Sequence, residues 1–237
     1  MTDSVTVAEA RFGTGSTARV VCISGLAVEA KIARTAGFSV VAGAGDRDHT
    51  ATLVATAAAQ ADCLVSFGIA GGLAPELKTG TVVVSGEVVS EGQHWAIEPS
   101  LRCQLSKFAQ SIGAIEGLVF GASSILATQT EKERVWSTSR ALAVDIESEI
   151  VARTATELGI PFIVLRSIAD TARRDLPLAS LVPITASGKP DLLKFLSAVL
   201  RQPFQVPGMI GLARETAIAL SALVGPARAL HSLVAGA

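Results

Sequence analysis

The chain has no excess of charge of either sign. Its 237 residues contain 20 Lys and Arg against 21 Asp and Glu, which gives a formal net charge of -1. A nucleic-acid-binding surface needs basic residues gathered on one face, so nucleic acid is not an expected partner. Hydrophobic residues make up 49% of the chain, which is enough for one large core and argues against overall disorder.

Cysteine is scarce. Cys22, Cys63 and Cys103 lie about forty residues apart, so they neither pair off completely as disulfides nor have the spacing of metal ligands. We expect reduced, mostly buried thiols and no metal site.

Long apolar runs are lacking as well. The first residues include Asp3 and Glu9 and have no apolar segment typical of a secretory signal. Uncharged stretches reach about a dozen residues, whereas a helix that spans a bilayer needs about 20. We therefore expect a cytoplasmic protein with a mobile Gly/Ser/Thr-rich leader over residues 1–17 and a single domain over 18–237.

The most informative stretch of the chain is 141–172. A β-type run at Leu142–Ile146 is followed by helical spacing over Glu147–Leu158, which Gly159 ends, and by a nearly apolar strand at Phe162–Ile168. This order predicts one β-α-β unit of a parallel sheet that is covered on both faces.

Acidic residues stand at the ends of both of these strands. Asp145 and Glu147 close the first strand, and Asp170 follows the second. Because open α/β sheets bind ligands beyond the carboxyl ends of their strands, we expect the three carboxylates to converge on one crevice.

Other elements precede this unit. We expect strands and helices to alternate over Arg19–Ser24, Leu26–Ala36, Val40–Gly45, His49–Gln60, Cys63–Phe67, Thr81–Ser85 and Leu101–Ile112. Glu29 falls in the first turn of the first helix, where the helix dipole favours an acid. Gly43-Ala44-Gly45 invites a dinucleotide-binding interpretation, but Asp48 occupies the place of the third glycine, so a tight strand-to-helix turn is preferred.

A glycine-rich run follows the third strand. Gly68-Ile69-Ala70-Gly71-Gly72-Leu73 exposes backbone N–H groups and lets a ligand approach the chain closely. This run, Val144-Asp145-Ile146-Glu147-Ser148 and Arg166-Ser167-Ile168-Ala169-Asp170 resemble, in the right order, three motifs of the nucleoside phosphorylase and nucleosidase superfamily. The resemblance implies a three-layer α/β/α fold around a mixed central sheet.

The resemblance also implies roles for particular residues. Asp170 would protonate the purine and Glu147 would hold the ribose hydroxyls. Glu29 would orient the attacking water or lie near phosphate. The substrate would be bound further by Ile146, which stands where the family usually has Met, and by Asp145, Ile69, Ala70, Gly71 and Leu126, the last at the place of a base-stacking residue.

The nucleophile is left open by the motifs. Ile69 replaces a Ser or Thr that many relatives use to contact phosphate or ribose, and the arginines with which phosphorylases bind phosphate have no clear counterpart. Both water and phosphate stay open, with inorganic phosphate as a co-substrate in the second case and no other cofactor expected. Residues 87–100, with Glu91 and His94, are interpreted as a surface loop, or by resemblance as a wall beside the base or a neighbouring subunit.

Beyond Asp170 the chain turns apolar and mildly basic. Asp191 could cap a helix over Leu192–Leu200, and 206–234 is dominated by Ala, Leu, Ile and Val. This annex, 177–237, is either extra core or an oligomer interface, or else a surface for a hydrophobic substrate or a membrane.

The overall pattern resembles the hopanoid-associated phosphorylase branch, which implies release of adenine from adenosylhopane. The expected enzyme thus cleaves the N-glycosidic bond of an adenine nucleoside with an apolar 5′ group. We expect it to be a homodimer or higher homo-oligomer, with possible contact to the inner membrane through the annex. A methylthioadenosine/S-adenosylhomocysteine-type nucleosidase and a non-catalytic nucleoside-binding relative are the alternatives.

Overall fold

The computed structural model describes residues 18–43, 47–177 and 206–235. The strands are β1 Val20–Ser24, β2 Ser39–Ala42, β3 Cys63–Gly72, β4 Val82–Ser85, β5 Glu87–Ser90, β6 Gln93–Ala96, β7 Ile115–Glu116, β8 Val119–Gly121, β9 Ala143–Asp145 and β10 Phe162–Asp170. The helices are α1 Ala27–Thr35, α2 Arg47–Ala58, α3 Pro99–Ser111, α4 Gln129–Ser139, α5 Ser148–Leu158, α7 Val206–Ala222 and α8 Val224–Ala235. The predicted leader 1–17 and the helix expected after Asp191 lie outside the described residues.

All ten strands form one mixed sheet. Its main path runs β6-β5-β8-β9-β3-β10-β4-β7, and β1 pairs with both β3 and β2. β3 and β10 are the longest strands and pair in parallel over most of their length at the centre. Every residue of β10 is buried, as a strand covered on both faces requires.

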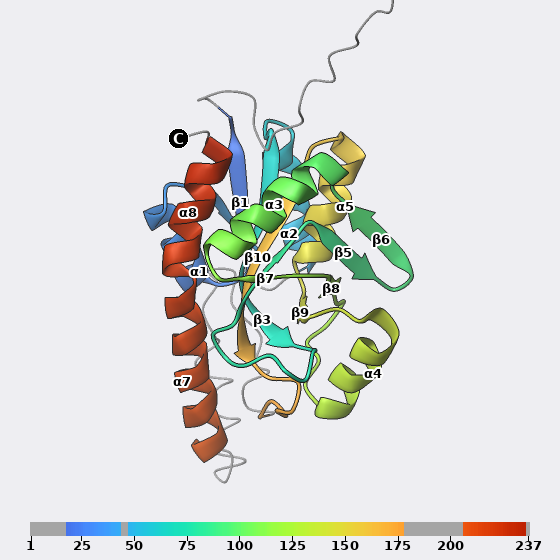
Figure 1. Ribbon diagram of the computed structural model, residues 1–237, viewed down its shortest axis with the longest axis vertical. Coiled ribbons are helices and arrows are strands. Elements are labelled where there is room, and N and C mark those ends of the chain that lie inside the picture. The colour runs from blue at the N-terminus through green and yellow to red at the C-terminus, as the bar shows by residue number, and fades with distance from the viewer. Residues whose placement is uncertain (1–17, 44–46, 178–205, 236–237) are drawn as a thin grey trace, which may run out of the picture.

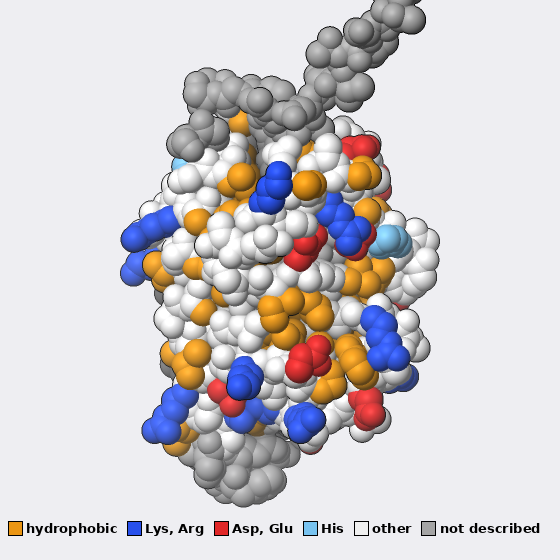
Figure 2. All heavy atoms as spheres, viewed as in Figure 1, with side chains coloured by type: hydrophobic (Ala, Val, Ile, Leu, Met, Phe, Trp, Pro, Cys, Tyr) orange, Lys and Arg blue, Asp and Glu red, His pale blue; other side chains and the backbone are white. Residues whose placement is uncertain are grey.

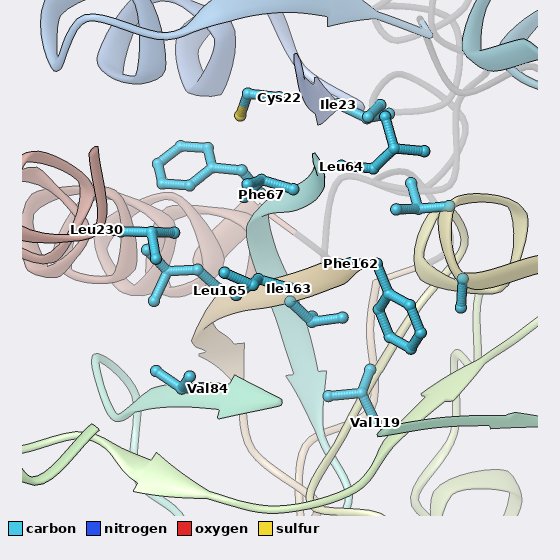
Figure 3. Close-up of a cluster of buried hydrophobic side chains, with 14 of the residues drawn as sticks. Cys22, Ile23, Leu64, Phe67, Val84, Val119, Phe162, Ile163, Leu165 and Leu230 are labelled. Carbon is cyan, nitrogen blue, oxygen red and sulfur yellow. The ribbon is translucent and has the colours of Figure 1, made fainter. Parts of the chain in front are cut away.

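Helices cover both faces of the sheet (Figure 1). α2 packs against α5 on one side, while α1 packs against α8 on the other. Figure 3 shows Leu230 of α8 among core side chains of the strands, including Phe67 and Leu165. This arrangement confirms the expected α/β/α architecture around a mixed central sheet.

The prediction of a parallel β-α-β unit is wrong about the direction of its first strand. β9 pairs antiparallel with β3, whereas β10 pairs with β3 in parallel, so β9 and β10 run in opposite directions on the two sides of β3. The chain therefore leaves the sheet at β9, passes through α5 and returns at β10, which lies two strands away from β9. Strand direction depends on non-local pairing, which the apolar runs of the two strands do not encode.

The segment expected to be a surface loop is a β-hairpin instead. β5 and β6 pair antiparallel around Glu91 and Gly92, and both of these residues have positive φ, at 37° and 83°. A two-residue turn with positive φ at both positions matches the twist of the flanking strands. β5 continues into the main sheet by pairing with β8.

The apolar C-terminal region forms α7 and α8, which run down one side of the molecule (Figure 1). Its fully buried residues recur on one helix face, at Ala219, Leu223, Ala227, Leu230 and Val234. By length and composition Gly208–Ala235 could cross a membrane, and 28% of its most apolar window is buried inside the structure. We expected no stretch long enough to cross a membrane, because only residues without charge were counted. Gly208–Ala235 reaches that length when its few charged residues are included.

The distribution of surface charge and the burial of the cysteines agree in part with what the composition predicted. On the face shown in Figure 2, acidic and basic side chains are interspersed. Cys22 and Cys63 are buried as expected, whereas Cys103 is exposed. Burial raises the pKa of both buried thiols, which keeps them protonated.

Candidate active site

The site is built around a gap in the hydrogen bonding of β3. Along one edge β3 pairs with β1 through Cys63–Ser66 and with β9 through Gly71 and Gly72, while β10 occupies the other edge. Because β1 and β9 are antiparallel, their carboxyl ends point toward each other across the intervening stretch of β3. The residues that follow each strand therefore meet there.

Two charged side chains complete the free edge of β3. The N–H of Ile69 donates to Glu29 Oε1 at 2.8 Å, and its carbonyl accepts from Arg166 Nη1 at 3.2 Å. The other oxygen of Glu29 accepts from the N–H of Leu26 at 2.8 Å, at the start of α1. Glu29 thus lies in the first turn of α1, as the sequence predicted, caps the start of that helix and is also a member of the site.

Two glycines make room for the carboxylates. A Cβ on Gly25 would lie 2.3 Å from Glu147 Oε1, and a Cβ on Gly68 would lie 2.4 Å from Glu29 Oε1. Real side chains do not approach this closely, so any larger residue would displace an acid. Gly25, after β1, and Gly68, within β3, are therefore required because a carboxylate lies too close to each for a Cβ to fit.

Arg166 is a buried cation between the acids and is only 1% exposed. Its Nε lies 2.9 Å from Asp145 Oδ2, and its Nη2 lies 3.1 Å from Glu147 Oε2 and 2.6 Å from Ser66 Oγ. A buried ion pair persists where hydrogen bonds satisfy the remaining polar groups. The two Nη groups of this guanidinium have hydrogen-bond acceptors, whereas Nε meets the Asp145 carboxylate as an ion pair without a hydrogen bond.

Asp145 has a supporting position. Its Oδ1 accepts the N–H groups of Glu147 and Ser148 at 3.0 and 2.7 Å, and its Oδ2 accepts the Ser148 hydroxyl at 2.5 Å. Since these groups and Arg166 occupy both oxygens, Asp145 fixes the start of α5 and the direction of Glu147.

Burial shifts the titration of the two glutamates. It raises the pKa of Glu29 to about 7, with Arg166 opposing the rise and Glu147 adding to it. It also raises the pKa of Glu147 against the lowering effect of Arg166. A carboxyl such as Glu29, whose pKa is raised to about 7, is suited to exchange a proton near neutral pH.

Asp170 reaches the cavity through a β-bulge. Ile168 pairs with Ala70 and Asp170 with Gly71, so the register of β10 shifts at Ala169. The extra residue takes Asp170 out of the alternation that buries Ile168 in the core, as bulges near functional sites commonly do. Burial raises the pKa of Asp170, against lowering effects from Lys132 and Arg174.

A cavity of about 280 Å³ joins these groups. All the residues predicted to form the site line it: Asp170, Glu29, Glu147, Ile146, Asp145, Ile69, Ala70, Gly71 and Leu126. The strand ends thus bring the predicted residues together, although β9 runs opposite to the expected direction. Gly43, the described end of the G-x-G run, and the β5–β6 hairpin do not line this cavity.

Sequence reasoning missed several members of the site. Arg166 was noticed only as part of a motif, and Lys132 on α4 was not singled out. Lys132 Nζ lies 2.5 Å from Asp170 Oδ2. The signal for α4 was present, since Thr128 accepts from the N–H of Glu131 and Glu131 accepts from the N–H of Thr128 in a capping box. Leu176 and, on α7, Leu212 and Thr216 also line the cavity.

The sequence matches a known family. The model of the phosphorylase superfamily matches residues 8–201. The chain belongs to the phosphorylase superfamily. This confirms the resemblance at the level of the superfamily.

Curated relatives show a partial likeness to this chain. The 5′-methylthioadenosine/S-adenosylhomocysteine nucleosidase of Shewanella halifaxensis is 26% identical over 138 residues, which is 49% of this chain and 60% of the relative. The nucleosidase of the same name from Tolumonas auensis is 28% identical over 137 residues, again 49% of this chain and 60% of the relative. The chain thus spans about 60% of the length of these curated relatives.

Solved structures of other proteins share the fold. Futalosine hydrolase of Helicobacter pylori aligns with a TM-score of 0.61 at 17% identity, covering 78% of this chain and 98% of the other. A 5′-methylthioadenosine/S-adenosylhomocysteine nucleosidase from Neisseria meningitidis, in complex with methylthio-immucillin-A, aligns with a TM-score of 0.62 at 21% identity, covering 90% and 99%.

Proposed function

We propose that this chain cleaves the N-glycosidic bond of an adenine nucleoside. The observation that carries the proposal is one cavity lined by two sets of ionisable groups, the Glu29–Glu147–Arg166 cluster and Asp170. Breaking such a bond develops positive charge on the ribosyl ring and negative charge on the purine. An anionic cluster suits the ring, and an acid with a raised pKa suits the purine.

In this mechanism Asp170 transfers its proton to N7 of the departing adenine. Glu147 accepts hydrogen bonds from the ribose hydroxyls and fixes the ring. Glu29, with a pKa raised to about 7, takes a proton from the attacking water. The two curated relatives described above are nucleosidases by name, which supports this class of reaction.

Water is the proposed nucleophile. Among the described residues that line the cavity, the acids other than the proton donor Asp170 are Glu29, Asp145 and Glu147, and the one cation is Arg166. That cation is already engaged by Asp145 and Glu147. A phosphate dianion would meet uncompensated negative charge in a desolvated site, which costs more than in water.

The proposed substrate carries an apolar 5′ group, and adenosylhopane fits this description. Support comes from the apolar side chains of Ile125, Leu126, Leu176 and Leu212, which line the cavity together. Leu212 belongs to the C-terminal annex, so the tail supplies part of the wall. The resemblance to the hopanoid-associated branch points the same way.

Peripheral membrane contact and a homo-oligomer belong to the same proposal. The helices α7 and α8 expose the apolar residues Ile210, Ile218 and Val224, and Arg214 and Arg228 of the same two helices are exposed as well. Apolar side chains with sparse cations suit the surface of an anionic membrane. The proposed contact is with the cytoplasmic face of the membrane, and flotation with anionic vesicles tests it. Light scattering tests the oligomeric state.

A soluble-nucleoside enzyme of the methylthioadenosine/S-adenosylhomocysteine type is the second candidate, favoured by the names of the relatives. One experiment separates the possibilities. Purified protein is incubated with adenosine analogues that bear 5′ groups of increasing apolar length, with and without phosphate, and adenine and sugar products are separated.

The proposal predicts free sugar in both buffers and faster adenine release as the 5′ group lengthens. A sugar 1-phosphate would overturn the choice of water, and a preference for the shortest group would favour the second candidate. Absence of adenine with every analogue would leave a non-catalytic nucleoside-binding protein.

A further inference from the structure

Lys132 is a buried cation behind Asp170. Its side chain is 0% exposed, and it is the one buried residue of α4, a helix otherwise at the surface. Lysine is among the residues least often buried completely unless it is paired. Its position therefore calls for an explanation beyond packing.

All three N–H bonds of the Lys132 ammonium are used within the protein. Nζ donates to Asp170 Oδ2 at 2.5 Å, to the carbonyl of Thr171 at 3.0 Å and to the carbonyl of Arg174 at 2.8 Å. A lysine has three donors, so none is left for a ligand. Any effect of Lys132 on the substrate must pass through Asp170.

A purely structural role would tie the segment after β10 to α4. That segment is already held there by other bonds, since Gln129 N donates to Asp175 Oδ1 at 2.7 Å and Leu176 N donates to the carbonyl of Ala127 at 2.7 Å. The ammonium adds a positive charge within hydrogen-bond distance of the carboxyl that faces the cavity. A neutral donor would serve a tether equally well.

We infer that Lys132 is a positioning residue that keeps Asp170 acidic enough to give up its proton during bond cleavage. The inference rests on the proposed function. The C1′–N9 electron pair passes to the purine, the Asp170 proton passes to N7, and a buried carboxylate remains beside the Lys132 ammonium. The ion pair stabilises that carboxylate, which burial alone would disfavour.

Other charges also face Asp170. Arg174, which follows β10, lowers its pKa as Lys132 does, and Arg174 is itself paired with Glu215 of α7 at 3.0 Å. Across the cavity lie the charged groups Glu29, Asp145, Glu147 and Arg166. Of the described cations, Lys132 is the one in direct contact with the carboxyl.

The first test is the pH dependence of kcat in Lys132→Gln and Lys132→Met. An opposite charge close to a carboxyl lowers its pKa by about 1–3 units. Loss of the charge should therefore lower kcat by about tenfold or more and move the basic limb of the profile upward by at least about one pH unit. An unshifted limb would overturn the inference.

The second test combines Lys132→Met with Asp170→Asn, which removes both buried charges and so avoids leaving an ammonium or a carboxylate unpaired. If Lys132 acts through Asp170, the double variant should release adenine at the rate of Asp170→Asn alone. An additional loss of the same factor that Lys132→Met causes in the wild type would show a structural role instead. Failure of the proposed function itself is distinguishable, because the wild type would then release no adenine.

Discussion

At the scale of single residues, the site depends on close approach as much as on charge. Gly25 leaves room for Glu147, because a Cβ would lie 2.3 Å from Oε1. The acids themselves were predictable from the sequence, since Asp145, Glu147 and Asp170 stand at strand ends. Their partners were less predictable. Arg166 and Lys132 are identified by distances that no spacing in the sequence encodes.

Gly25→Ala should displace Glu147 and so weaken its proposed contact with the ribose. A misplacement of about 1 Å can cost about 10²-fold in rate, so kcat/KM for adenosine should fall by that order. The loss should be much smaller for the 2′-deoxy substrate, which lacks one of the hydroxyls that Glu147 would bind. Gly225→Ala is the matched control, because a Cβ there meets nothing within 4 Å. Equal losses on both substrates would contradict the contact.

Glu29 should make stability depend on pH. Its pKa rises from 4.5 to about 7 on folding, so between these values the folded state binds more protons than the unfolded state. The contribution of Glu29 to the free energy of unfolding is fully present below pH 4.5 and is lost as the pH rises through 7. At about 1.36 kcal/mol per pKa unit the change is roughly 3 kcal/mol.

Denaturant unfolding of the wild type and Glu29→Gln at about pH 4.5 and pH 8 measures this linkage. The stability of the wild type relative to the variant should fall between the two pH values. A difference that stays constant would mean that Glu29 titrates in the native protein as it does when unfolded.

At the scale of elements, the positions of helices could be predicted from local sequence patterns, whereas the pairing of strands could not. The helices α1, α3 and α5 lie within a few residues of their expected ranges, because apolar periodicity and end signals such as Gly159 are local. The direction of β9 and the pairing of β5 with β8 depend on partners far along the chain. α4 was missed because it is mostly exposed and carries little apolar periodicity.

α7 contributes to the cavity through one face only. Leu212 lines the cavity, while Ile218 on the same helix is 51% exposed. Leu212→Glu should raise KM for a long apolar 5′ substrate over that for adenosine, since contact with about 60 Å² of apolar surface corresponds to about 1.5 kcal/mol, or tenfold. Ile218→Glu is the control and should not change this ratio.

Leu223 follows directly after α7, but Leu223→Glu is unsuitable as a further test of substrate specificity. Leu223 is fully buried in the main core, so a carboxylate there should reduce folding before it affects specificity. Equal effects of Leu212→Glu on both substrates would show that the α7 face is packing and would direct the search toward small nucleosides.

At the scale of the whole molecule, β1 and β9 end opposite each other beside β3, and this opposition creates the site. The expectation of converging acids was correct, although it was derived from a parallel sheet edge. In the structure the carboxyl ends meet because the two strands approach from opposite directions along one edge of β3. The covered architecture then buries the acids and raises the pKa of Glu29, Glu147 and Asp170 together.

The most direct test of the account is adenine release by Asp170→Asn compared with the wild type, with thermal unfolding measured on both. General acid catalysis contributes about 10²–10⁴-fold, so the variant should retain about a hundredth of the wild-type rate or less and still unfold cooperatively. A folded variant that keeps more than about a tenth of the rate would contradict the assignment of Asp170 as the acid.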